Sequence, residues 1–123
     1  MGFPGTDKKR GLRQSFRDAW RGLSYAFSTQ RNFRWEVLIA VAVIAVLPSL
    51  PLTFAEAAGA YFFVVLVLLA ELINTAVEKA VDRISPEFHP VAGIAKDVSA
   101  GAVLLVATAA LIYALVILLR IWR

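Results

Sequence analysis

Hydrophobic and polar positions divide the chain into one amphipathic segment and three long apolar segments. Residues 11–30 repeat apolar side chains with the period of an α-helix, and arginines recur at every fourth position: Arg13, Arg17 and Arg21. This pattern is typical of a helix that lies in a membrane interface, with aromatic side chains toward the acyl chains and arginines toward anionic headgroups. The apolar face could also pack on the chain's own membrane helices, and the two arrangements are compatible.

Three apolar segments follow this helix. We expect membrane-spanning helices at about 33–50, 53–84 and 91–120, because each can cross a hydrocarbon core of roughly 30 Å at about 1.5 Å per residue. The second segment continues into a polar run and is predicted to be longer than the bilayer is thick. The sequence therefore predicts an all-α integral membrane protein, with one membrane domain over 1–123, three transmembrane helices and an N-terminal amphipathic surface helix.

Prolines mark the breaks between the three segments. Proline lacks a backbone donor and disfavours helix in the residue before it. Pro48 and Pro51 are therefore expected to end or kink the first span, and Pro86 and Pro90 to separate the second span from the third.

The composition supports a membrane protein. Of the 123 residues, 59% are hydrophobic, which is too apolar for a soluble domain and leaves room for about three spans. The formal charge of +4 raises the possibility of a nucleic-acid partner, but eight of the thirteen basic residues precede Val37 and do not form one binding face. We therefore expect no nucleic acid. Cysteine is absent, so a metal would need carboxylate oxygens or the single His89, which favours a hard cation such as Mg²⁺.

The basic residues also indicate an orientation. Eight precede the first span, none lies between Pro48 and Ala55, and three lie in or beside the second connection: Lys79, Arg83 and Lys96. The positive-inside rule places the N-terminus and the second connection in the cytoplasm. Arg120 and Arg123 then lie outside, which is a minor conflict. The polar end of the second span would face the compartment that holds ATP.

Polar side chains interrupt the apolar pattern of the second span at helical spacing. Glu71, Asn74, Thr75, Glu78 and Asp82 fall within about one quadrant of the helix at ~100° per residue. A charge near the hydrocarbon boundary costs about 2.5–3.5 kcal/mol, so such residues usually mark a site. An amide alone often only cross-links membrane helices, but two glutamates beside it favour a functional site.

Lys96 and Asp97 begin the third span at about the membrane depth of Glu78. Phosphoryl transfer needs a cation against the phosphates, a carboxylate for a metal and a base for the attacking hydroxyl, and these residues can supply all three. The sequence contains neither a Walker A loop nor a kinase glycine-rich loop.

Two other functions fit the intramembrane carboxylates. The protein could be a small ion or proton pathway, since such groups relay protons or bind cations. The outer halves of the spans, however, offer almost no polar groups to continue a path. An accessory membrane subunit is the third possibility, but it gives Glu71 no purpose.

Several motifs together resemble the prokaryotic diacylglycerol kinase family, which includes the undecaprenol kinases of Gram-positive bacteria. They are E-L-I-N-T-A-V-E at 71–78, V-D-R at 81–83, A-K-D at 95–97 and A-G-A-V at 100–103. The resemblance covers nearly the whole chain. It implies a three-span homotrimer in the bacterial inner membrane, with a cytoplasmic N-terminus. It also implies transfer of the γ-phosphate of MgATP to the primary hydroxyl of a membrane lipid, diacylglycerol or undecaprenol.

The resemblance implies roles for residues on the lipid side of the site. Glu71 would be the base for the lipid hydroxyl, and Asn74 would lie close enough to orient it. Glu36, at the start of the first span, matches a family position near the lipid headgroup. The sequence alone leaves the choice between diacylglycerol and undecaprenol open.

The resemblance also implies a nucleotide side. Glu78 would be a ligand of ATP-bound Mg²⁺, and Lys96 with Asp97 would bind the nucleotide. Gln30 is a departure, because it stands where the family usually carries a second metal-binding glutamate. An amide oxygen can still ligate Mg²⁺ but brings no charge.

Overall fold

The computed structural model describes residues 11–123, which form helices and no strand. The helices are α1 (Leu12–Thr29), α2 (Arg31–Val46), the short 3₁₀ helix η1 (Leu47–Ser49), α3 (Phe54–Ile84) and α4 (Pro90–Trp122). Three segments are long and apolar enough to cross a membrane: Arg31–Ser49, Phe54–Ile84 and Pro90–Trp122. The all-α fold class, with three apolar spans after an N-terminal helix, is confirmed.

A single residue separates the surface helix from the first span. Gln30 leaves helical geometry with φ −102° and ψ 110°, and α2 begins immediately after it at Arg31. The first span therefore starts two residues earlier than expected. At its other end, α2 gives way to η1 at Leu47, directly before Pro48, where the missing donor of proline disfavours a continued α-helix.

A reciprocal pair of hydrogen bonds fixes the start of α3. The Glu56 backbone N–H donates to Thr53 Oγ1 across 3.2 Å, and the Thr53 backbone N–H donates to Glu56 Oε2 across 2.8 Å. This capping box satisfies two N–H groups that a helix start leaves without partners. The sequence T-x-x-E is its signature.

His89 has a comparable role at the start of α4. Its Nδ1 accepts a hydrogen bond of 3.2 Å from the Val91 backbone N–H. Pro90 occupies the first helical position, where a missing N–H costs nothing. The single histidine thus caps a helix in this structure.

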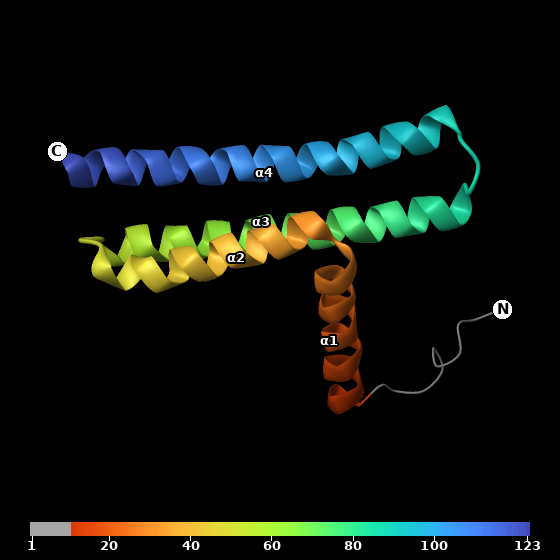
Figure 1. Ribbon diagram of the computed structural model, residues 1–123, viewed down its shortest axis with the longest axis horizontal. Helices are drawn as coiled ribbons and strands as arrows, with labels where there is room; N and C mark the ends of the chain where they lie inside the picture. The colour runs from red at the N-terminus through yellow and green to blue at the C-terminus, as the bar shows by residue number, and fades with distance from the viewer. Residues whose placement is uncertain (1–10) are drawn as a thin grey trace.

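α3 packs against both of its neighbours in the chain, α2 and α4. In Figure 1, α3 and α4 run antiparallel along the length of the molecule, α2 lies beside the first half of α3, and α1 turns away from all three spans. The contact between α3 and α4 is the most extensive of any two helices. No residue of α4 is buried, so lipid or neighbouring protein must cover much of its apolar surface.

Polar contacts join the end of α4 to the start of α3. Arg120 Nε lies 2.6 Å from Glu56 Oε1, and an Arg120 N–H donates to the Pro51 carbonyl across 2.9 Å. The Tyr113 hydroxyl donates to the Glu56 backbone carbonyl across 2.7 Å. Gly59 lies against the Tyr113 ring, where a Cβ would overlap the hydroxyl. These contacts fix the register of the long antiparallel pair.

Candidate active site

Three polar residues of α3 are buried by the other helices. Glu71 is 5% exposed, Asn74 is 8% exposed and Thr75 is 7% exposed, and no other polar residue of the described chain is buried to this degree. All three belong to the polar stripe of the second span. This part of the stripe is therefore turned toward the rest of the protein, whereas Asp82 at its end is exposed.

Asn74 occupies the centre of a hydrogen-bond chain between α3 and α4. Its Nδ2 donates to Glu78 Oε1 across 3.3 Å, one helical turn away. Its Oδ1 accepts from the hydroxyl of Ser99 across 2.6 Å. A carboxylate can only accept hydrogen bonds, so the amide nitrogen must face Glu78, and the amide oxygen faces α4.

The nucleotide-side residues lie at the cytoplasmic end expected for the α3–α4 pair. Lys96 forms an ion pair with Asp82 and also interacts electrostatically with Glu78. The Lys96 and Asp82 side chains are 39% and 54% exposed, so a ligand could reach both. Asp97, the next residue along α4, is exposed. The structure thus brings Lys96 together with Glu78 and Asp82 and leaves Asp97 on the surface.

Glu36 reaches the same cluster from α2. One of its carboxylate oxygens, Oε2, is buried and has no hydrogen-bond partner among residues 11–123. Its charge interacts with that of Glu71. A buried acceptor without a partner is uncommon and can accept a donor from a ligand.

An apolar groove extends from Glu36 between α2, α3 and α4. Its volume is about 700 Å³, and its lining includes Val43, Val64, Val67 and Ala110. Glu56 lies among the lining residues contributed by the start of α3. Glu36 and Glu56 are the two charged residues of the lining, and the rest is almost wholly apolar.

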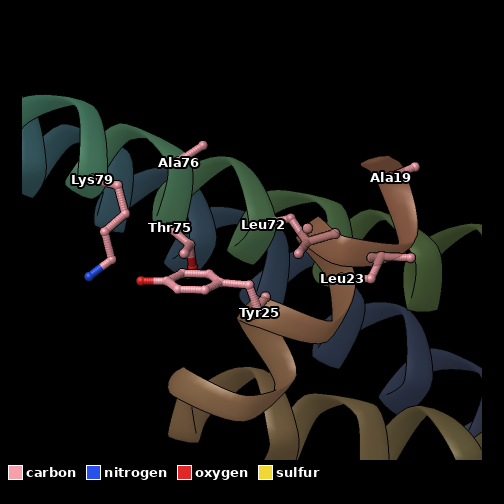
Figure 2. Close-up of a pocket in the computed structure, with 9 residues that line it drawn as sticks. Ala19, Leu23, Tyr25, Leu72, Thr75, Ala76 and Lys79 are labelled. Atoms are coloured by element: carbon pink, nitrogen blue, oxygen red, sulfur yellow. The ribbon is translucent and has the colours of Figure 1, made fainter. Parts of the chain in front are cut away.

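A second crevice separates α1 from α3, on the other side of the polar stripe. Its volume is about 480 Å³, and Figure 2 shows Tyr25 of α1 beside Thr75 of α3. The Tyr25 hydroxyl and the Lys79 ammonium point toward the same side of this crevice in that view, while Leu23 and Leu72 lie to the other side of the Tyr25 ring. α1 also contacts α3, the helix that carries Glu71 and Glu78, beside this crevice.

The metal ligands expected from the sequence are not assembled into a complete site within the subunit. Gln30 donates from Nε2 to its neighbour Thr29 across 3.3 Å. No group of three or more His, Cys, Asp or Glu residues within 11–123 is arranged to hold a metal ion. Mg²⁺ is nevertheless often held by one or two carboxylates together with phosphate oxygens of a substrate, and Glu78 can supply such a carboxylate.

Sequence reasoning missed Ser99 as a partner of Asn74. Its spacing of three residues after Lys96 places both on one face of α4, which is the only sequence signal that could have indicated it. The partnership of Lys96 with Asp82 was also missed, although Asp82 had been placed on the polar stripe. Both contacts cross from one span to the next.

Comparison with known proteins gives consistent results. The family model described as prokaryotic diacylglycerol kinase matches residues 17–118. A protein of Synechocystis sp. named diacylglycerol kinase is 50% identical over 99 residues, which cover 80% of this chain and 57% of that protein. The chain therefore spans little more than half the length of this relative.

Two other relatives are matched over more of their length. The undecaprenol kinase of Bacillus subtilis is 36% identical over 106 residues, covering 86% of each chain. The diacylglycerol kinase of Escherichia coli is 36% identical over 97 residues, covering 76% of this chain and 77% of that protein. The family match overlaps every helix and includes Glu71, Asn74 and Glu78, and this chain belongs to the prokaryotic diacylglycerol kinase family.

Proposed function

We propose that this protein is a membrane lipid kinase that transfers the γ-phosphate of MgATP to the primary hydroxyl of diacylglycerol or undecaprenol. One observation carries the proposal. The buried polar residues of α3, Glu71 and Asn74, lie between an apolar groove that begins at Glu36 and the cation of α4, Lys96, which interacts with Glu78. Kinase activity on a lipid requires such a junction, because one substrate is a hydrocarbon and the other is a polyanion.

The groove supports the lipid half of the proposal. Its volume of about 700 Å³ falls within the roughly 300–1,000 Å³ of typical ligand pockets. An acceptor chain that fills the groove would bring its hydroxyl to Glu36 and Glu71. The unpartnered Glu36 Oε2 would then accept a hydrogen bond from the acceptor headgroup.

Residues near the start of α4 support the nucleotide half of the proposal. Lys96 would offset phosphate charge, and Asp97 would meet the exposed part of the nucleotide. Glu78 would hold Mg²⁺, with Gln30 as a neutral second ligand. When bound, the metal would neutralise charge on the phosphates and orient them.

The proposed reaction needs one base. Glu71 accepts the proton of the lipid hydroxyl as the hydroxyl oxygen forms a bond to the γ-phosphorus. The bond between that phosphorus and its bridging oxygen breaks, and the electron pair leaves with ADP. The products are a lipid phosphate monoester and ADP, and Glu71 then releases its proton. Asn74 would lie beside the base on the same face of α3, with its own hydrogen bonds going to Glu78 and Ser99.

The proposed setting is the bacterial inner membrane, with the N-terminus and the acidic cluster toward cytoplasmic ATP. Eleven of the thirteen basic residues lie on this side, which supports the orientation. Gln30 and Lys96 remain partly exposed within one subunit, and α4 buries no residue. We therefore include a homotrimer, with sites completed between subunits, in the proposal.

An ion pathway is less consistent with these features. Between Glu36 and Glu56 the groove is lined almost entirely by Ala, Val, Leu, Ile and Phe. Conduction would need polar groups or water along this length. The groove therefore offers no polar path from Glu36 toward Glu56.

The test is phosphorylation of lipids by the purified protein in bilayer nanodiscs. Nanodiscs with diacylglycerol, with undecaprenol or with neither receive MgATP labelled at the γ-phosphate. We expect label in one or both lipids and none in their absence. Protein that remains trimeric, binds MgATP and labels neither lipid would overturn the proposed function.

A further inference from the structure

We infer that Ser99 is a positioning residue, which holds the Asn74 amide so that Glu78 and Lys96 are kept in place for the nucleotide. The inference rests on the proposed function, because it concerns the nucleotide side of that site. It adds a residue that the sequence motifs do not include.

With Glu78 ionised, the hydrogen-bond chain has one consistent arrangement of donors and acceptors. Glu78 Oε1 accepts from Asn74 Nδ2 across 3.3 Å, so the Asn74 oxygen must point the other way. That oxygen lies 2.6 Å from Ser99 Oγ. A carbonyl oxygen needs a donor, and the Ser99 hydroxyl provides it.

The hydroxyl of Ser99 has two acceptors within reach. Besides Asn74 Oδ1, the carbonyl of Lys96 in the same helix lies 2.9 Å away. A serine carries one hydroxyl proton, and the shorter contact is the one to Asn74. The bond to Asn74 joins α3 and α4, as does the ion pair of Lys96 with Asp82 nearer the connection between these helices.

The burial of Asn74 makes the loss of its hydrogen bond to Ser99 costly. Asn74 is 8% exposed and lies in a membrane-spanning helix, where water is a poor substitute for a lost partner. Without the Ser99 hydroxyl, the Asn74 oxygen would lose its donor, and the amide would rotate to find another. Its nitrogen would then leave Glu78.

The bond between Ser99 and Asn74 also fixes the position of Lys96 relative to α3. Ser99 follows Lys96 by three residues and so shares its face of α4. The bond to Asn74 therefore places Lys96 opposite Glu78, with which it interacts electrostatically, and within reach of Asp82. One hydroxyl thus influences both groups proposed to meet MgATP, whereas Glu71 and the groove lie further along α3.

The test compares nucleotide binding with lipid turnover. The trimer in nanodiscs receives Mg²⁺ and the β,γ-methylene analogue of ATP, and equilibrium binding is measured. Loss of a partner that orients a metal-binding group commonly costs 10–100-fold, so we expect Ser99→Ala to weaken binding about tenfold. The KM for the lipid should change little, and Ser99→Thr should restore binding because it keeps a hydroxyl.

A matched control is available on the same helix. Thr108 Oγ1 donates only to the Leu104 carbonyl of its own helix, across 2.7 Å. Thr108→Val removes a hydroxyl from α4 without touching the proposed site and should leave binding unchanged. Equal weakening by Ser99→Ala and Thr108→Val would overturn the inference, because it would indicate a general effect on α4.

A double-mutant cycle identifies the route of the effect. If Ser99 acts through Asn74, Ser99→Ala should add nothing to binding in an Asn74→Ala background. The same weakening in both backgrounds, or unchanged binding in Ser99→Ala alone, would overturn the inference. Binding that follows the expected pattern in a protein that phosphorylates neither lipid would instead contradict the proposed function and leave the positioning role supported.

Discussion

Arg120 and Glu56 form an ion pair of 2.6 Å between the last turns of α4 and the first turn of α3. Arg120 also donates to the Pro51 carbonyl, so its side chain fastens the end of α4 to the turn that precedes α3. The pair also gives Arg120 an acidic partner at the end of α4 that lies away from Lys96. Its partner, Glu56, lies at the same end of the spans, and the Arg120 guanidinium bonds both of its carboxylate oxygens.

The first prediction concerns the contacts of Arg120 with Glu56 and Pro51. Arg120→Ala should lower the midpoint of thermal unfolding by a few degrees in detergent micelles, because α4 loses its contacts to Glu56 and Pro51. Kinase activity per folded molecule should change little, since the pair lies far along the spans from Glu71. Arg123→Ala is the control, with no expected change. An Arg120→Ala protein as heat-stable as the control would show that the pair contributes nothing.

The second prediction concerns the proposed base. Glu71→Gln removes a proton acceptor and keeps the shape of a side chain that is 5% exposed. Phosphoryl transfer should fall by roughly 10²–10⁴-fold, the usual contribution of a general base, while binding of MgATP persists. Glu87→Gln makes the same change at an exposed residue outside the proposed site and should keep most of the activity. Label transfer from γ-labelled ATP measures both variants, and near-normal turnover in Glu71→Gln would refute the assignment.

The third prediction concerns the close approach of α3 and α4. A Cβ on Gly59 would overlap the Tyr113 hydroxyl and ring, so Gly59→Ala should push the helices apart and weaken the Tyr113 bond to Glu56. We expect a lower unfolding midpoint, with partial recovery in the Gly59→Ala, Tyr113→Ala double variant.

Gly101 provides the comparison for that substitution. A Cβ at Gly101 meets no atom within 4 Å, and alanine is the better helix former, so Gly101→Ala should leave the midpoint unchanged or raise it. Thermal unfolding of the purified variants measures both effects. If Gly59→Ala is no less stable than Gly101→Ala, the packing described for Tyr113 is wrong.

The fourth prediction concerns Gln30, the proposed neutral ligand of Mg²⁺. Gln30→Glu should lower the Mg²⁺ concentration that gives half-maximal activity, because a charged ligand replaces a neutral one. Gln30→Ala should raise that concentration. Titration of activity with Mg²⁺ at saturating lipid measures both changes. Identical Mg²⁺ dependence in all three proteins would mean that position 30 does not reach the metal.

The sequence by itself determined the secondary structure and the position of the acidic stripe. Apolar runs, prolines and the T-x-x-E cap act within one segment, so each span could be located without knowledge of its neighbours. The helical period alone also places Glu71, Asn74 and Glu78 on one face of α3. The motifs around them were enough to indicate the family.

Only the tertiary structure decided which groups meet across the spans. Ser99 bonds Asn74 from 25 residues away, and Arg120 reaches Glu56 from 64 residues away. Such pairs depend on the rotation and register of one helix against another, which are set by the packing of many small and large side chains, such as Gly59 against Tyr113. The groove that begins at Glu36 has the same origin, since three helices must be placed before it exists.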